Sequence, residues 1–221
     1  MSLTFSVLKQ GGTSDRVREA VLTDDGRIRV LPAATWLSFS WDEVRLFMHE
    51  YPIYVLPTEE LISDLRALIS PYKRTIEIGA GTGNVGRALG VRMTDSYLQE
   101  NPGVRACYAL AGQPTITYPS DVMRADALSA VRILKPDCVF GCYVTHYSED
   151  GAGSSWGVKF DKILPKVRRL IVVGNPQTHG ANPIMKCYHK EIINPGKIIT
   201  RSGAGPDNTI YVWGDLGNLL F

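Results

Sequence analysis

Residues 75–89 read Thr-Ile-Glu-Ile-Gly-Ala-Gly-Thr-Gly-Asn-Val-Gly-Arg-Ala-Leu, and this stretch decides the fold. Its β-branched start predicts a buried parallel strand, which ends in the alternating glycines Gly79, Gly81 and Gly83 before a helix-like stretch. Without Cβ atoms the turn can adopt positive φ, and a ligand can lie against the backbone where the helix presents unpaired N–H groups. The stretch therefore predicts a strand, a tight turn and a helix that bind something small and polar.

Two classes of ligand use such a turn. The spacing of Gly81, Gly83 and Gly86 fits a dinucleotide fingerprint, in which an acid about 20 residues further on binds the ribose. Asp95 is the available acid and comes too early for that spacing. Glu77, inside the strand, would also repel a pyrophosphate, because like charges repel. An acid at this position instead favours a cationic ligand.

At this point the chain resembles the class I S-adenosylmethionine-dependent methyltransferases. Their first motif reads hydrophobic, hydrophobic, Asp/Glu, x, Gly, x, Gly, x, Gly, and residues 76–83 match it, with Thr75 standing at the first hydrophobic place. The resemblance covers about residues 58–215. It implies that Glu77 faces the methionine end of the cofactor, directly or through water. It also implies close approach of the cofactor to the backbone of Gly79, Ala80, Gly81 and Gly83.

Three further acids are candidates for the cofactor site under this resemblance. Asp95 ends a predicted strand at residues 90–95, where the family places the carboxylate that accepts both ribose hydroxyls. An acid beyond the third strand meets the adenine amino group in the family. We prefer Asp121 for this role, because a third strand is predicted at Thr115–Tyr118, and Asp126 remains the alternative.

The fourth predicted strand, residues 137–144, is almost continuously apolar, so both of its faces are expected to be covered. Ligands in open α/β sheets bind beyond the carboxyl ends of the strands. This places Cys142 and Tyr143 beside the cofactor and His146 and Tyr147 beside the methyl acceptor.

His146 is the best candidate for a general base, because imidazole titrates near neutral pH. A base is not obligatory, since a sulfonium is an activated donor and positioning supplies most of the rate for a soft or anionic acceptor. The fifth predicted strand, residues 169–174, brings Asn175 or His179 to the same acceptor. The Gly/Ser-rich residues 148–158 are either a substrate gate, with Trp156 over a planar acceptor, or a surface loop.

The rest of the chain is expected to complete a Rossmann-like, doubly wound α/β fold with a mostly parallel seven-stranded sheet and helices on both faces. Residues 1–56 are predicted to form an N-terminal extension, and residues 57–221 the cofactor-binding domain. The following list gives the remaining predicted elements: a hairpin around residues 23–26, a helix over about 41–50, a helix from Thr58 to Pro71, a loop over 99–113, a helix after residue 119, a helix over 160–167, and strands at 187–193, 197–200 and 209–213. Tyr51, Tyr54 and Thr58 belong either to the pocket wall or to the core.

Bulk composition sets limits on partners and location. The chain has 221 residues, 44% of them hydrophobic, and a net charge of +2, which is too mild to indicate a nucleic-acid surface. No apolar run of about 18 residues and no signal-peptide pattern is present, so a cytoplasmic protein is predicted. The four cysteines form no CxxC pair and are expected to be small buried hydrophobic residues.

The function that follows is S-adenosylmethionine-dependent methyl transfer to a small molecule or protein. Nucleic-acid enzymes of this class that methylate amino groups carry Asp/Asn-Pro-Pro-Tyr/Phe after the fourth strand. This chain has residues 142–146, Cys-Tyr-Val-Thr-His, in that place, so a nucleic-acid acceptor is less favoured. The alternatives are an NAD(P)-dependent oxidoreductase and a non-catalytic module that binds S-adenosylmethionine or a nucleoside. The oligomeric state is open.

Overall fold

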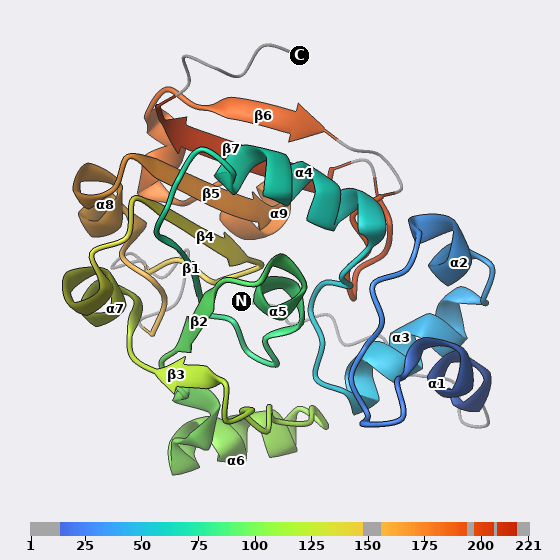
Figure 1. Cartoon of the computed structure of the whole chain (residues 1–221). Coiled ribbons are helices and arrows are strands. Elements are labelled where there is room, and N and C mark those ends of the chain that lie inside the picture. Colours follow the sequence, from blue (N-terminus) through green and yellow to red (C-terminus); the bar gives the residue numbers. More distant parts are fainter. Residues whose placement is uncertain (1–13, 148–155, 194–196, 206, 216–221) are drawn as a thin grey trace.

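The protein is described by a computed structural model, which covers residues 14–147, 156–193, 197–205 and 207–215 (Figure 1). Within these residues a seven-stranded sheet has the order β3-β2-β1-β4-β5-β7-β6. The strands are β1 Thr75–Ile78, β2 Arg92–Asp95, β3 Val122–Arg124, β4 Cys138–Cys142, β5 Arg169–Gly174, β6 Lys190–Ile193 and β7 Thr209–Gly214. The first five strands are mutually parallel, and β7 runs antiparallel between β5 and β6. The predicted doubly wound α/β sheet is therefore confirmed.

Helices lie on both faces of the sheet. The helices are α1 Asp15–Val21, α2 Ala33–Leu37, α3 Trp41–Glu50, α4 Glu59–Ile69, α5 Asn84–Leu89, α6 Pro102–Leu110, α7 Ala127–Leu134, α8 Phe160–Ile163 and α9 Pro176–His179, with short 3-10 turns η1 Leu98–Glu100, η2 Leu164–Lys166 and η3 Pro183–Lys186. The apolar side of α4 packs against Phe140 and Ile171 on one face. α7 and α8 pack against Val139 and Leu170 on the other. Alternate residues of β4 and β5 thus enter opposite cores, which explains their continuous apolar sequences.

The N-terminal helices have a hydrophobic cluster of their own. It includes Val17 and Val21 of α1, Trp36 of α2 and Phe47 of α3, all of which are almost completely buried. Figure 1 shows α1–α3 on the side toward which the arrows of β4 and β5 point. These helices therefore lie by the carboxyl ends of the strands, where ligands bind in this type of sheet. The proposed boundary between residues 56 and 57 stays a prediction.

Both predicted N-terminal capping motifs are present. Ser40 accepts a hydrogen bond from the backbone N–H of Glu43, whose side chain accepts one in return from the Ser40 N–H. Thr58 caps α4 by accepting from the Leu61 N–H at 3.2 Å, so its role is structural. No helix in the described part of the chain is long and apolar enough to span a membrane.

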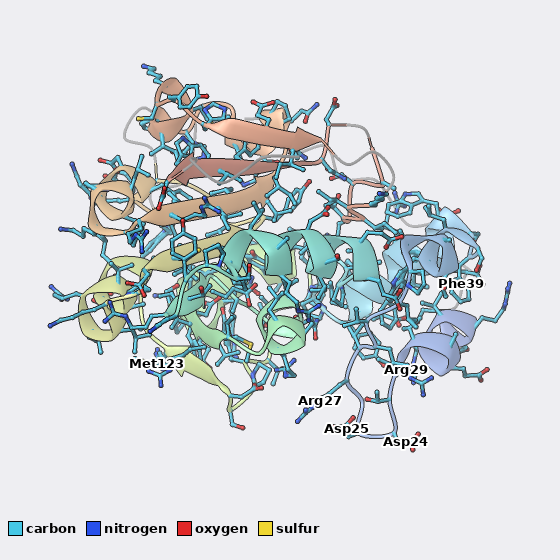
Figure 2. All side chains as sticks on the ribbon, turned by 45° about the horizontal axis from the view of Figure 1, so that its top comes forward. Asp24, Asp25, Arg27, Arg29, Phe39 and Met123 are labelled. Carbon is cyan, nitrogen blue, oxygen red and sulfur yellow. The ribbon has the colours of Figure 1, made fainter. Side chains whose placement is uncertain are left out.

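The predicted N-terminal hairpin is only partly correct. The turn after Thr23 is present, but a single antiparallel bridge between Leu22 and Ile28 replaces the two strands. The residues before it form α1, because Val17 and Val21 are one helical turn apart and both face the N-terminal core. Figure 2 shows Asp24, Asp25 and Arg27 projecting from the tip of this turn.

Two predictions around the third strand are wrong. Residues 99–113, expected to be a loop, contain η1 and α6, and Asn101 caps α6 by accepting from the Gly103 N–H at 2.9 Å. The Asn-Pro pair was a helix start, because proline suits the first helical position. Residues 115–118 have no strand assignment, and β3 lies at Val122–Arg124 instead.

The predicted strand at residues 197–200 is also absent. Thr200 makes only isolated bridges, to Val55 and Gly203. These contacts hold the C-terminal segment against the chain that leads into α4. The predicted Asn-Pro-Gly turn at residues 194–196 lies outside the described residues, as do residues 1–13 and most of the proposed gate at residues 148–158.

Candidate active site

A pocket of about 660 Å³ opens at the carboxyl ends of β1, β2 and β4. β1 and β4 are neighbours in the sheet, but the chain completes β2 and β3 on the other side of β1 before it forms β4. Such a switch point leaves a crevice between the strand ends, where ligands bind. Of the predicted site residues, those lining the pocket are Glu77, Gly79, Ala80, Gly81, Asp95, Cys142 and Tyr143.

The glycine turn adopts the predicted left-handed conformation. Gly79, Gly81 and Gly83 have φ angles of 59°, 54° and 72°. A Cβ on Gly79 would lie 2.6 Å from Val144 Cγ2, so this position is closed to other residues. A Cβ on Gly81 would stand 3.1 Å from Ile116 Cδ1, a residue that also lines the pocket. The turn therefore presents bare backbone to the pocket.

Glu77 is a buried carboxyl at the base of this turn. It is 2% exposed, and its Oε2 accepts a hydrogen bond from the Gly86 N–H of α5 at 2.9 Å. Burial raises its pKa to about 8; the Gly86 bond and Arg87 oppose this rise, and nearby Asp95 adds to it. A cation placed in the pocket would stabilise the charged form of Glu77.

Asp95 joins β2 to the glycine turn. Its Oδ2 accepts from the Gly81 N–H and its Oδ1 from the Tyr97 N–H, each at 2.9 Å. Burial raises its pKa above the ordinary value, while these hydrogen bonds and one from the Tyr118 hydroxyl oppose the rise. Each carboxylate oxygen has a second lone pair, so Asp95 can still accept hydrogen bonds from a ligand.

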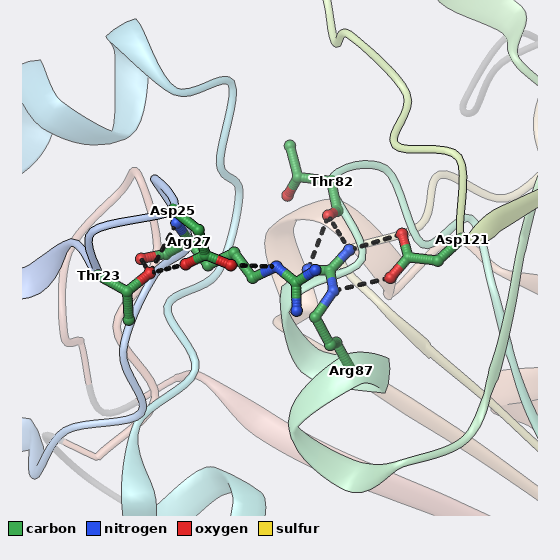
Figure 3. A network of polar contacts seen from close by, with 6 residues as sticks. All are labelled: Thr23, Asp25, Arg27, Thr82, Arg87 and Asp121. Atoms are coloured by element: carbon green, nitrogen blue, oxygen red, sulfur yellow. Dashed lines mark hydrogen bonds and ion pairs between the residues drawn. The ribbon is translucent and has the colours of Figure 1, made fainter.

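The two acids predicted to follow the third strand do not line the pocket. Asp121 precedes β3 instead of following it, and Arg87 holds it with two hydrogen bonds of 2.8 Å (Figure 3). The preference for Asp121 rested on a misplaced strand. Asp126 is the acid beyond the carboxyl end of β3, and it caps α7 by accepting from the Ser129 N–H at 3.0 Å. Neither lines the pocket directly, although Ala125 and Ala127 do.

Gly83 does not line the pocket, and it follows Thr82, whose carbonyl belongs to the same network. The Arg87 guanidinium also donates to the carbonyl of Thr82, at 3.4 Å. Figure 3 shows Arg27, on the N-terminal turn with Asp25, reaching toward Asp121 and Arg87. The charge of Arg27 contributes to the lowered pKa of Asp121, after the larger effect of Arg87. Arg87 thus links the turn that carries Gly83 to Asp121, just before β3, and this turn lies near the N-terminal segment.

Cys142 and Tyr143 line the pocket at the end of β4. Burial and the neighbouring Glu77 raise the pKa of the Cys142 thiol well above its ordinary value, so the thiol stays protonated. Tyr143 has a left-handed φ of 55°, and its hydroxyl donates to Asn208. Asn175 donates to the same hydroxyl at 3.4 Å and caps α9 by accepting from the Thr178 N–H. Asn175 supports Tyr143 and does not line the pocket itself.

The predicted base lies away from the pocket surface. His146 is 1% exposed, and neither His146 nor Tyr147 lines the pocket. The Lys159 ammonium lies 4.2 Å from the centre of the Tyr147 ring. His179 is equally buried and accepts from the Asn175 N–H. The residues that do face the pocket here are Val144, Thr145, Trp156, Gly157 and Val158.

A cluster of uncharged polar groups forms the opposite wall. The hydroxyls of Tyr54 and Tyr108 are 3.2 Å apart, and Gln99 Nε2 donates to Tyr108 at 3.2 Å. Arg201 lies 4.4 Å from the centre of the Tyr54 ring and donates to the Ile53 carbonyl. Of the upstream candidates, Tyr54 thus lines the pocket, whereas Tyr51 packs on Phe47.

Sequence reasoning missed Gln99 and Tyr108, because residues 99–113 were interpreted as a loop, and it missed Tyr118, because residues 115–118 were interpreted as a strand. The Asn-Pro helix start was the signal that would have indicated α6. Two of the four cysteines also differ from expectation: Cys138 and Cys142 are buried, but Cys107 and Cys187 are exposed. Among the described residues, no group of three or more His, Cys, Asp or Glu side chains is arranged to hold a metal ion.

The sheet is mostly parallel, closes with an antiparallel hairpin, and has a buried acid before a left-handed glycine turn at its switch point. The chain has a Rossmann-like, doubly wound α/β fold. No protein-family model and no curated protein sequence matches it.

Three solved structures with a similar arrangement are distant in sequence. The O-methyltransferase from Bacillus cereus in complex with SAH is 12% identical, with 91% of this chain and 96% of that chain covered and a TM-score of 0.43. A putative O-methyltransferase from Klebsiella pneumoniae is 14% identical, with the same coverage and a TM-score of 0.42. The O-methyltransferase TomG from Streptomyces achromogenes in complex with SAM is 14% identical, covering 75% of this chain and 84% of that chain, with a TM-score of 0.38. The fold assignment rests on the sheet and the glycine turn of this chain.

Proposed function

We propose that this protein is an S-adenosylmethionine-dependent methyltransferase whose acceptor is a small molecule or a protein. The observation that carries the proposal is Glu77, a buried carboxyl at the switch point whose charged form lacks a full counter-charge. Burial raises its pKa to about 8, and a ligand with a positive charge would reverse that shift. S-adenosylmethionine carries a sulfonium and an ammonium group and so has the required charge.

The described residues fit this cofactor. Gly81 has a left-handed φ and presents bare backbone to the pocket, where a Cβ would crowd Ile116, so a ligand can approach closely. Glu77 would face the methionine end, and Asp95 would accept hydrogen bonds from the ribose hydroxyls. Ala125 and Ala127, on either side of Asp126, line the end of the pocket proposed for the adenine. When bound, the cofactor supplies a methyl group already activated at sulfur.

The chain itself supplies position and exclusion of water. Thr145 and Trp156 lie at the part of the pocket where β4 ends, and Trp156 is 64% exposed. An acceptor held between them would lie near the end of β4, and holding two reactants in line accounts for much of the rate of such a transfer. Since His146 and Tyr147 do not line the pocket, the proposed mechanism relies on positioning and assigns no general base.

The first test is binding. We expect S-adenosylmethionine and S-adenosylhomocysteine to bind in calorimetric titration and NAD not to bind. Asp95→Ala should weaken both sulfur ligands at least tenfold, because the ribose loses its acceptor and the glycine turn loses its tie to β2. Asp126→Ala, at a residue that caps α7, compares a second acid from the same edge. Binding of NAD alone, or unaltered affinity of Asp95→Ala, would reject the cofactor site.

Affinity should also depend on pH. The pKa of Glu77 is about 8 in the free protein, and a bound cation lowers it, so binding releases a proton. Between about pH 6 and pH 7 the affinity for S-adenosylmethionine is therefore expected to rise roughly tenfold. Glu77→Gln should remove this dependence. A pH-independent affinity in the wild-type protein would show that Glu77 does not meet the charged end of the ligand.

Binding and turnover are separate questions. A screen of small-molecule and protein acceptors with methyl-labelled cofactor tests the catalytic part of the proposal. Cofactor binding without transfer to any acceptor would favour the non-catalytic binding module.

A further inference from the structure

The edge of the sheet opposite the pocket carries two adjoining grooves. One, of about 720 Å³, lies beside α7, α8 and η2, and the other, of about 600 Å³, lies beside α4 and α5. Both are at the amino ends of the central strands and share Arg74. Their cationic residues, here called the basic edge, are Arg66, Lys73, Arg74, Arg92, Arg132, Lys135, Lys162, Lys166 and Arg168. Figure 1 shows α7 and α8 on the side from which the arrows of β4 and β5 start.

Charge is strongly segregated on this edge. It holds nine of the 24 Lys and Arg residues of the chain, whereas Asp137 is the one acid of the 22 that lines the described part of either groove. The remainder of the chain is therefore acidic on balance. A net charge of +2 hides this separation, which is why composition did not indicate an anion-binding surface.

Several cations of the basic edge have no acidic partner. Arg74 pairs with Asp137 at 2.9 Å, Lys162 with Asp161 at 3.0 Å, and Arg168 with Asp215 at 2.9 Å. In the part of the chain that the structure covers, Lys73, Arg92, Lys135 and Lys166 form no ion pair and are exposed. These four side chains are free to meet an anion from solution.

Helix dipoles explain only part of this pattern. α4 and α7 end at this edge, and a cation in the last turn complements the negative end of a helix. Arg66 and Arg132 occupy such positions. Arg92 instead begins β2, and Lys73 precedes β1. The cations at the strand starts therefore need another explanation.

The cations form a row and do not converge on one point. Arg92, Arg74 and Arg168 stand at the starts of β2, β1 and β5, and β4 lies between the last two strands. With neighbouring strands about 4.8 Å apart, the row extends over roughly 14 Å. Phosphates of one DNA strand recur about every 3.4 Å along the axis, so a backbone lying along the row would place about four phosphates over its length.

We propose that the basic edge binds the phosphodiester backbone of a nucleic acid. Tyr72 is the aromatic residue among the described groove residues, and it is 8% exposed beneath Arg168 and Arg169. It cannot stack on bases, so binding is to the backbone and independent of sequence. The edge lies across the sheet from the cofactor pocket and does not depend on the proposed methyl transfer. The basic edge anchors the protein on a nucleic acid, and this nucleic acid is not the proposed methyl acceptor.

The test uses fluorescence anisotropy with a short labelled DNA duplex and a single-stranded RNA. The triple variant Lys73→Glu, Lys135→Glu, Lys166→Glu removes unpaired cations from the basic edge. The matched control is Arg105→Glu, Arg29→Glu, Lys197→Glu, which makes the same change in net charge at exposed positions away from this edge. Circular dichroism reports on folding, and titration with S-adenosylmethionine reports separately on the cofactor pocket.

We expect wild-type binding to weaken with salt with a logarithmic slope of about −4 between about 50 and 200 mM. The basic-edge variant should lose at least 30-fold in affinity and retain a slope near −1. The control should keep most of the affinity, and both variants should bind cofactor as the wild type does. The proposal is overturned if neither nucleic acid binds at low salt, or if both triple variants weaken binding equally. Preferential binding to vesicles of phosphatidylserine and phosphatidylcholine would overturn it as well.

Discussion

Glu77→Gln is expected to raise the melting temperature of the ligand-free protein at about pH 8.5 and to weaken binding of S-adenosylmethionine. The pKa of Glu77 in the folded protein is about 8, above its ordinary value of 4.5, because the carboxyl is buried. Folding therefore favours the neutral form. The contribution of neutral Glu77 to the free energy of unfolding is fully present below about pH 4.5 and is lost as the pH rises through 8. At about pH 8.5 the loss is on the order of 4 kcal/mol.

Glutamine avoids this loss and keeps the local geometry. Its amide oxygen can accept the Gly86 N–H as Glu77 Oε2 does, and it carries no charge at any pH. The same neutrality removes the attraction for a cationic ligand, so stability and binding should change in opposite directions. Active sites commonly show this trade-off, because groups held there for function are poorly solvated.

Thermal unfolding at about pH 5 and pH 8.5 separates this explanation from a general packing effect. The gain of Glu77→Gln should be several degrees at the higher pH and nearly absent at the lower. Glu19→Gln, at an exposed position on α1, is the matched control and should change little at either pH. An equal gain at both pH values would contradict the argument from charge.

Gly86→Ala is expected to destabilise the protein by about 3 kcal/mol and to reduce cofactor binding. The usual effect in a helix has the opposite sign, since alanine is about 1 kcal/mol better than glycine there. At Gly86, however, a Cβ would lie 2.4 Å from Glu77 Oε2 and 2.6 Å from Met93 Cγ. Both neighbours are buried, so the new methyl group must displace α5 or the carboxyl.

Denaturant unfolding, compared with Gly205→Ala, tests this prediction. A Cβ on Gly205 meets nothing within 4 Å, so that variant should be close to neutral. The double variant Gly86→Ala, Glu77→Ala should recover part of the lost stability, because it removes the carboxyl that the methyl group meets. A stabilising effect of Gly86→Ala alone would mean that Glu77 does not lie against α5.

Local patterns were sufficient for the elements that carry the glycine turn. β1, the turn, α5 and β2 lie where the sequence placed them, because strand periodicity, positive φ at glycine and a helix start are properties of adjacent residues. The caps at Ser40 and Thr58 are correct for the same reason. Asp95 was also recognisable, since it ends a strand that must lie beside β1 in a parallel sheet.

The predictions that differ from the structure depend on contacts between distant segments. The sequence around Asp121 permitted two positions for the third strand, and pairing of β2 with Val122–Arg124 selected one. That pairing placed Asp121 at the wrong end of the strand. His146 follows β4, as expected, but it is 1% exposed and does not line the pocket, and such burial depends on contacts between separate segments, which no local pattern encodes.

The run of motifs at residues 75–95 thus determined the fold class and the acids beside the glycine turn. Tertiary structure decided the remaining pocket wall, where Tyr54, Gln99 and Tyr108 meet from separate segments. It also gathered nine cations from separate helices and strands onto one edge. Short-range hydrogen bonding and backbone conformation are encoded within a few residues, whereas the meeting of side chains across a sheet depends on which strands pair and which faces are buried.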